Sequence, residues 1–220
     1  MEWHNLLLFL HVLLFVFWLG TDVGVFLAAK ISEKGELSTE TRSTVLGLGM
    51  VLDRLPRSAL ILIFPTGLQL SVNTGQLDVA SSIVVAVWAV ALVWLAILWL
   101  GFMKPQTPTE QRAMLFNFAM NALLAIVVTG YGLYLWLGDH AAAWVAFKVL
   151  VVGLIFVAGV LLDALFKPAV EAFVDIVTNG GSAERDEKYA RAISPVYKIV
   201  LAIYVLVMVA AYLGLAKPLI

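Results

Sequence analysis

The chain has 220 residues, of which 62% are hydrophobic and 13% are charged, and its formal net charge is −1. Because an average soluble domain has roughly 25% charged residues, this composition excludes an ordinary soluble globular protein and predicts an integral membrane protein. The chain contains no cysteine, which excludes disulfide bonds and thiolate metal sites. The acidic start and the length of the first apolar run favour a retained first helix over a cleaved signal peptide.

Six apolar segments predict six membrane-spanning helices, because one crossing needs about 20 mostly apolar residues. In chain order they are residues 3–29, 45–72, 80–102, 113–137, 142–166 and 195–216. We therefore expect an all-α integral membrane protein in which residues 1–220 form a single transmembrane domain, a six-transmembrane-helix bundle. Most connections are short, but residues 30–44 form a polar link and residues 167–194 form the longest connection.

The connection 167–194 should contain an amphipathic stretch, a break at Gly180 and Gly181, and a short second helix. Ser182 is the predicted N-cap of that helix, because a serine hydroxyl can accept from the free N–H groups of a first turn. Pro195 is expected in the first turn of the last span, where its missing N–H costs no hydrogen bond.

The distribution of basic residues predicts the orientation. All but two of the 14 Lys and Arg residues lie in or beside alternate connections, the exceptions being Lys148 and Lys217. Because basic residues concentrate on the cytoplasmic side, connections 30–44, 103–112 and 167–194 are predicted to be cytoplasmic. Both termini then face outward, and we expect a multi-pass protein of the bacterial inner membrane with a periplasmic N- and C-terminus.

An internal similarity favours a duplicated two-helix unit. Residues 58–70 align with residues 121–133, and Lys104-Pro105 aligns with Lys167-Pro168, both at an offset of 63 residues. Predicted helices 2–3 would be one copy and helices 4–5 the other, arranged as parallel repeats.

His11 is the most informative single residue, because an ionisable side chain inside a membrane span is costly and is a functional-site candidate. From the helical rise of about 1.5 Å per residue, it should lie in the outer third of the bundle. Residues expected at the same depth are Thr66, Gln69, Trp88, Thr129, Lys148 and Met208. A second polar layer is predicted near the cytoplasmic side and comprises Asp22, Asp53, Arg54, Arg57, Asn117, Asn121 and Asp163. Its simplest interpretation is that Asp22 and Asp53 pair with the arginines.

An axial ligand to haem b is the first role that His11 could have, because imidazole is the usual haem ligand and a helical bundle suits an apolar macrocycle. Met208 or His140 would be a second ligand. Haem propionates need cationic partners, for which we expect Lys148, Arg57 and Arg54. Trp88 and Thr129 would line the pocket.

Other roles remain open. His and Met side chains also suit copper, although the six methionines are scattered along the chain. A proton-coupled transporter would use His11, Lys148, Asp22 and Asp163 as relay groups, and a non-catalytic assembly factor is a related alternative. The remaining alternative is a neutral histidine that is hydrogen-bonded to a neighbouring carbonyl or hydroxyl.

Two segments resemble known membrane proteins. FLHVLLFVFWLG (residues 9–20) is similar to the first helix of HemJ-type protoporphyrinogen oxidases and of CopD-type copper-resistance proteins, and LDRLPRSALILIFPTGLQL (residues 52–70) is similar to the start of their second helix. The resemblance covers residues 1–105. The HemJ resemblance implies haem b bound through His11 and redox chemistry on a porphyrin, and the CopD resemblance implies copper handling on the periplasmic side. The chain departs from the HemJ pattern because residues 80–102 contain no Lys or Arg.

These observations together predict a membrane haem b protein with a redox or electron-transfer role and His11 as the iron ligand. A haem-dependent oxidoreductase activity stays open. The expected partners are membrane lipid and an electron-transfer partner or quinone, with a homo-oligomer left open and no nucleic acid.

Overall fold

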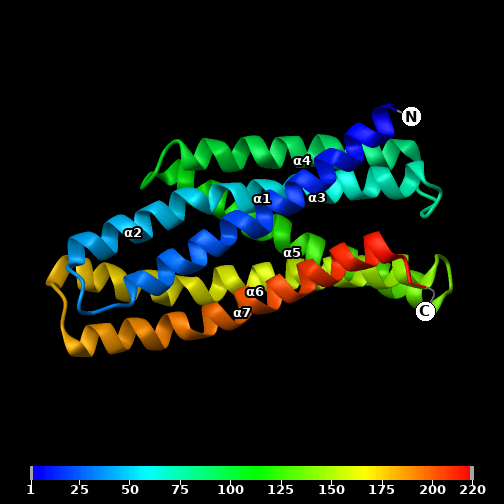
Figure 1. Ribbon diagram of the computed structural model, residues 1–220. Coiled ribbons are helices and arrows are strands. Elements are labelled where there is room, and N and C mark those ends of the chain that lie inside the picture. The colour runs from blue at the N-terminus through cyan, green and yellow to red at the C-terminus, as the bar shows by residue number, and fades with distance from the viewer. Residues whose placement is uncertain (1, 219–220) are drawn as a thin grey trace.

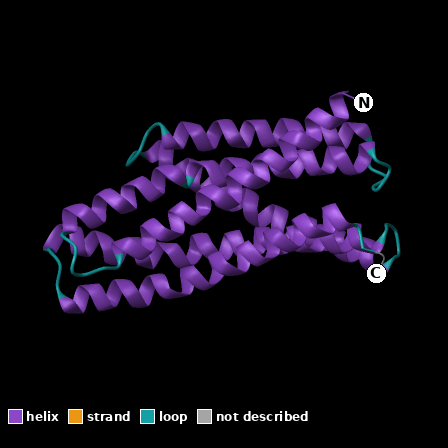
Figure 2. Ribbon diagram, in the orientation of Figure 1, coloured by secondary structure: helices purple, strands orange, loops and turns teal. Residues whose placement is uncertain are grey.

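The computed structural model describes residues 2–218, and these residues fold into seven helices joined by short connections (Figure 1 and Figure 2). The helices are α1 (Glu2–Ser32), α2 (Thr39–Leu52), α3 (Arg54–Asn73), α4 (Ser81–Phe102), α5 (Pro108–Leu137), α6 (Ala143–Asn179) and α7 (Ala183–Ala216). The predicted all-α class is confirmed for the described residues.

Five of the helices, namely α1, α4, α5, α6 and α7, are long and apolar enough to cross a membrane. Large apolar side chains on their outer faces are exposed, such as Ile126 at 75% and Leu137 at 81%. Such side chains are stable against lipid and would be costly in water. The chain is therefore a multi-pass helical membrane protein.

The predicted second span, residues 45–72, is wrong as a single helix, because α2 and α3 meet at Asp53. The N–H of Asp53 donates to Gly49 O at the end of α2, and the Asp53 carbonyl accepts from the Arg57 N–H at the start of α3. Pro56 lies in the first turn of α3, where a proline has no N–H to continue the hydrogen bonds of the preceding helix. The α3 helix has 20 residues, a length of about 30 Å at the usual rise.

The break predicted at Gly180 and Gly181 is confirmed, since α6 ends at Asn179 and α7 begins at Ala183, but the rest of the connection predicted at 167–194 is not separate from the spans. Helix α6 continues through Pro168 to Asn179, and α7 runs unbroken through Pro195, so that this proline is inside the helix and not in its first turn. Helices of 37 and 34 residues are about 50 Å long, whereas the hydrocarbon core is about 30 Å thick. Both helices therefore extend well beyond the hydrocarbon.

Burial explains why these extensions are helical. Side chains from the end of α6 form a core with side chains from the start of α7, and its members are Ala169, Ala172, Phe173, Ile176, Tyr189, Ile193, Val196 and Tyr197. Their apolar contacts offset the cost of a proline inside a helix. The N-cap prediction is confirmed, since the Ser182 side chain accepts from the Arg185 N–H at 3.3 Å.

The polar link predicted at 30–44 is reduced to six residues, because α1 ends at Ser32 and α2 begins at Thr39. Arg42 of α2 is 1% exposed. Its Nε donates to Ser32 O at 2.7 Å and its Nη1 donates to Asp186 Oδ1 of α7 at 2.7 Å. Ser32 Oγ lies 2.8 Å from Tyr189 Oη. These bonds join α1, α2 and α7 at one end of the molecule.

Figure 1 shows that the α1–α2 and α6–α7 connections project beyond the α4–α5 connection at one end. The N- and C-terminal ends both lie at the opposite end of the molecule, on different sides of it. In the aligned repeats, Lys104-Pro105 follows the end of α4, whereas Lys167-Pro168 lies inside α6. The two matched Lys-Pro pairs therefore occupy different structural positions.

Helices α5 and α6 approach each other closely through glycines, a common device in membrane bundles. A Cβ atom at Gly132 would lie 2.7 Å from Leu150 N, and one at Gly153 would lie 2.7 Å from Thr129 N. Both contacts are with backbone, which cannot give way as the end of a flexible side chain can. The crossing therefore has no room for a side chain at either glycine.

Gly153→Ala should lower the free energy of unfolding by about 1–3 kcal/mol, the usual cost of overpacking a core. Equilibrium unfolding in mixed detergent micelles measures it. Gly159→Ala is the matched control on the same helix, since a Cβ there would meet nothing within 4 Å. We expect the control to be neutral or stabilising, because alanine favours helix over glycine. Equal losses in both variants would contradict the close approach.

Candidate functional site

His11 lies where α1 packs against α3, and its Nδ1 is 2.8 Å from Thr66 Oγ1. The Thr66 hydroxyl has a single proton, and two backbone carbonyls of its own helix accept it, Leu62 O at 3.0 Å and Ile63 O at 2.9 Å. When the hydroxyl donates to one of these carbonyls, it accepts from the imidazole. In that arrangement a neutral His11 carries its proton on Nδ1 and has an unprotonated Nε2.

This hydrogen bond confirms that Thr66 lies at the depth of His11, as the sequence predicts. It also matches the alternative of a neutral histidine bonded to a hydroxyl, although that bond leaves Nε2 unused. A Cβ at Gly67 would lie 3.0 Å from His11 Cε1. The absence of a side chain at Gly67 thus lets the imidazole pack against the backbone of α3.

Lys148 of α6 is the other ionisable residue of the outer layer. Its amine is close enough to His11 for its charge to act on the imidazole. The side chain lies across Gly214 of α7, where an added Cβ would collide with Nζ. Among residues 2–218, no ion pair of Lys148 is found. The outer layer therefore has a partly buried cation beside a histidine.

The two residues predicted as second ligands have other environments. Met208 is 49% exposed, whereas Val207 and Ala210 on the same helix are buried, so that Met208 lies on the outer side of α7. His140 is exposed in the α5–α6 connection and packs on Tyr134, with 4.3 Å between ring centroids. Neither placement supplies His11 with a second ligand.

Within residues 2–218, neither predicted pocket-lining residue makes a hydrogen bond with the His11 imidazole, and α1 has no close backbone contact with α4 or α5. Thr129 packs against Gly153 at the α5–α6 crossing, and its buried Oγ1 has no hydrogen-bond partner. Trp88 is partly buried on α4. Both contribute to the packing of the outer half of the bundle.

The inner polar layer is centred on Arg57. Arg57 Nε donates to Asp53 Oδ2 at 2.6 Å, and Arg57 Nη1 donates to Asp163 Oδ1 of α6 at 3.2 Å. Arg54 does not join these pairs, since its guanidinium lies 5.4 Å from the centre of the Phe102 ring. The predicted pairing of Asp53 with an arginine is confirmed, and Asp163 is the second partner.

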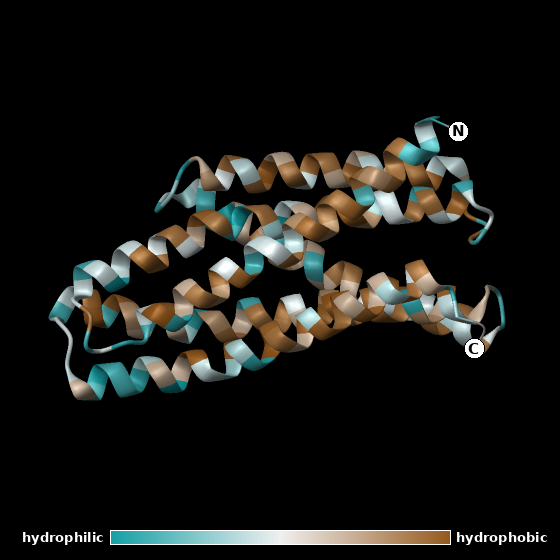
Figure 3. Cartoon of the chain, in the orientation of Figure 1, coloured by the Kyte–Doolittle hydropathy of each residue, from teal (hydrophilic) through white to brown (hydrophobic). Residues whose placement is uncertain are grey.

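Further residues extend this layer across the bundle. Asn117 Nδ2 of α5 donates to Asp163 Oδ2 at 3.5 Å, and Trp94 Nε1 of α4 donates to Asn117 Oδ1 at 3.2 Å. On the other side, Asp22 of α1 lies within interacting distance of Asp53, Arg57 and Tyr204. We call this group the Arg57 cluster, and its members are Asp22, Asp53, Arg57, Trp94, Asn117, Asn121, Asp163 and Tyr204. Figure 3 shows hydrophilic positions midway along the bundle, between apolar stretches.

Asp22 differs from the other two carboxyls, because no ion pair of Asp22 is found within residues 2–218. The predicted pairing of Asp22 with an arginine is thus not present. Tyr204 Oη is buried beside the Asp22 carboxyl, and the two groups lie close enough to form a hydrogen bond. The sequence reasoning missed Tyr204 and Trp94, and their depth along α7 and α4 was the signal that could have identified them.

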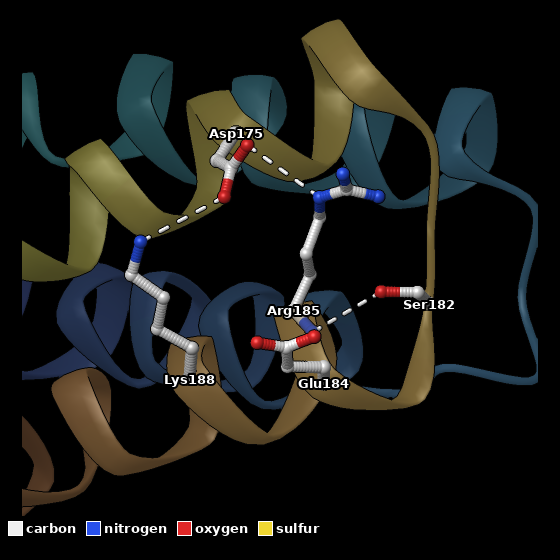
Figure 4. Close-up of a pocket in the computed structure, with 5 residues that line it drawn as sticks. All are labelled: Asp175, Ser182, Glu184, Arg185 and Lys188. Atoms are coloured by element: carbon white, nitrogen blue, oxygen red, sulfur yellow. Dashed lines mark hydrogen bonds and ion pairs between the residues drawn. The ribbon is translucent and has the colours of Figure 1, made fainter.

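A third polar group lies at the projecting end, around a shallow cavity of about 400 Å³ at the turn between α6 and α7. Figure 4 shows Asp175 between Arg185 and Lys188, with nitrogen–oxygen distances of 3.5 and 3.7 Å. Ser182 and Glu184 complete the lining. Exposed pairs of this kind contribute little energy, and both cations are paired with the one carboxylate of Asp175. We interpret this group as the capped end of a helical hairpin.

The chain thus has two polar sites inside the bundle, the His11 site and the Arg57 cluster. In comparisons with known proteins, no family model, curated protein or solved structure matches the chain.

Proposed function

We propose that this chain is a membrane haem protein that binds one b-type haem through Nε2 of His11, for a redox or electron-transfer role. The observation that carries the proposal is the hydrogen bond between His11 Nδ1 and Thr66 Oγ1 at 2.8 Å. Metal-ligating histidines usually donate their other ring nitrogen in this way, which fixes the tautomer and the ring orientation. The similarity of residues 9–20 to the first helix of HemJ-type proteins points in the same direction.

The number of ligands favours haem over copper. A bare metal ion in a protein generally needs three or four side-chain ligands. In the described part of the chain, no group of three or more His, Cys, Asp or Glu residues could hold a metal ion. A haem iron receives its four equatorial ligands from the porphyrin, so that a single imidazole is sufficient to hold it. Copper at the same histidine remains the second candidate.

Different residues around His11 would contact different parts of the haem. Thr66 would orient the imidazole, and Lys148 would pair with a propionate, since it is a partly buried cation that has no carboxylate partner among residues 2–218. Arg57 and Arg54 suit that role less well, because Arg57 already holds two carboxylates and Arg54 lies on Phe102. When bound, the haem would supply one-electron chemistry toward an electron-transfer partner or a quinone.

The same proposal includes the topology. With α3 as a sixth crossing, successive crossings alternate in direction and return the C-terminus to the side of the N-terminus, in agreement with their common end in Figure 1. Most basic residues belong to the other end, which we assign to the cytoplasm by the positive-inside rule. Both termini would then be periplasmic, in a bacterial inner membrane.

The visible absorption spectrum of the purified protein tests the haem proposal. Protein expressed with an ample haem supply should be red and show a Soret band, and His11→Ala should abolish that band. Thr66→Val should weaken haem retention by about 10–100-fold, the usual cost of losing the group that orients a ligand. His140→Ala is the control, because its ring packs on Tyr134, and it should retain the band.

Two results would contradict the proposal that His11 binds haem. A colourless protein that keeps copper after dialysis would favour the second candidate, and titration of copper into His11→Ala would locate its site. A Soret band that persists unchanged in His11→Ala would remove the histidine from the role of ligand.

A further inference from the structure

The Arg57 cluster has more acidic than basic groups at its centre. Its three carboxyls, Asp22, Asp53 and Asp163, face one guanidinium. Arg57 makes an ion pair with Asp53 and another with Asp163, whereas Asp22 makes none with any residue in 2–218. An isolated carboxylate inside a bundle is costly, and a second carboxylate beside it raises that cost further.

The cluster lies inside the bundle and away from its aqueous ends. Trp94, which binds Asn117, precedes the C-cap Met103 of α4 by nine residues, about 13 Å along the helix. Asn117 and Asn121 are 3% and 4% exposed. Bulk water therefore does not solvate these two amides, and each of their polar atoms needs a partner.

One amide oxygen at the cluster has no partner within the described chain. Asn121 Oδ1 is buried and accepts no hydrogen bond, and Asn121 lies one turn from Asn117 on the face of α5 that reaches Asp163. Tyr204 Oη is also buried, and the Asp22 carboxyl is the neighbour with which it can form a hydrogen bond. A buried acceptor without a protein partner fits bound water, which is the medium a proton needs.

We propose that the Arg57 cluster is a proton-binding site in the inner half of the membrane and that Asp22 holds the exchangeable proton. The proton forms an O–H bond with one Asp22 carboxyl oxygen, comes from water and returns to water, and no electron moves. The groups that face Asp22 from the packed helices are Asp53 and Arg57 from the α2–α3 junction and Tyr204 from α7. Arg57 holds the two neighbouring carboxylates in place, so that Asp22 is the one free to exchange.

Tyr204 can hydrogen-bond with the protonated, neutral form of Asp22. A protonated carboxyl has both a donor and an acceptor, and the tyrosine hydroxyl beside it has both as well. The two groups can then bond to each other or through one water without a buried charge. This site uses neither His11, Thr66 nor Lys148, and its test can be made on haem-free protein.

Infrared difference spectroscopy between acidic and alkaline buffer tests the proposal. A carboxylic acid has a C=O stretch that carboxylates and amides lack, and this band shifts in D2O. Wild-type protein in mildly acidic buffer should show the band of one buried acid and lose it reversibly as the pH is raised through neutrality. Asp22→Asn should abolish the band, and Tyr204→Phe should keep it at a changed frequency because a hydrogen-bond partner is lost.

Asp78→Asn is the control, since Asp78 is exposed in the α3–α4 connection, and it should leave the band unchanged. The wild-type titration needs no variant, so the test holds even if Asp22→Asn fails to fold. Absence of an acid band in the wild type, or its survival in Asp22→Asn, would overturn the proposal. Loss of the band when sodium replaces choline would overturn it in favour of a metal cation, and an unchanged frequency in Tyr204→Phe would contradict the tyrosine contact.

Discussion

Arg42→Ala should lower the free energy of unfolding by about 3–5 kcal/mol, because it breaks a buried ion pair and leaves one partner uncompensated. Arg42 is 1% exposed and donates to Asp186 Oδ1 and to Ser32 O, both at 2.7 Å. Its guanidinium also lies 5.9 Å from the centre of the Phe173 ring. Alanine would remove the charge, two hydrogen bonds and this packing together.

Equilibrium unfolding in mixed detergent micelles measures the loss, and hydrogen exchange of residues 39–52 should accelerate because Arg42 holds α2 against α1 and α7. Arg185→Ala is the control, since its ion pair with Asp175 is 3.5 Å long and partly exposed, and it should cost less than about 1 kcal/mol. The double variant Arg42→Met with Asp186→Leu should recover most of the stability, because an apolar pair of similar volume often replaces a buried ion pair without loss. Equal, small effects of Arg42→Ala and Arg185→Ala would contradict this role.

The helical class and the two polar layers can be predicted because they depend on local properties of the chain. Hydropathy identifies a span from its own residues, and a constant rise per residue converts position into depth. This reasoning places Thr66 at the depth of His11, and the 2.8 Å bond between them confirms it. It likewise places Asp53 and Asp163 at the depth of Arg57, with which both make ion pairs.

Helix ends cannot be predicted in the same way, because they depend on contacts between distant segments. Residues 167–194 look polar enough for a connection, yet Phe173 and Ile176 are buried against Tyr189 and Ile193 of the following helix. The residues around Pro168 and Pro195 do not show how much apolar surface is buried there. Only the packing of α6 on α7 shows that this burial outweighs the cost of a proline inside each helix.

The choice of partners within a layer also lies beyond the sequence. Asp22 and Asp163 are at similar depths, but of these two only Asp163 makes an ion pair with Arg57. That choice depends on how each helix is rotated about its own axis, and depth carries no information on rotation. The same limit explains why Met208, at the depth of His11, lies on the outer side of α7.

Arg57→Leu should lower the free energy of unfolding by about 3 kcal/mol. This value is at the lower end of the usual cost of breaking a buried ion pair, because the Arg57 side chain is partly exposed. The variant leaves Asp53 and Asp163 without a cation, at 18% and 22% exposure. Equilibrium unfolding in mixed micelles again measures the loss. Arg54→Leu is the matched control one turn earlier, where only a contact with Phe102 is lost, and it should cost less than about 1 kcal/mol.

A triple variant separates the charge from the packing of Arg57. Arg57→Leu combined with Asp53→Asn and Asp163→Asn has no uncompensated carboxylate at these positions, so it should regain most of the stability lost in Arg57→Leu. Failure of this rescue would mean that the guanidinium stabilises the bundle through its shape and not through its charge. Full rescue would establish that the cluster holds Arg57 to balance two carboxylates, which is the condition that leaves Asp22 as the group free to exchange a proton.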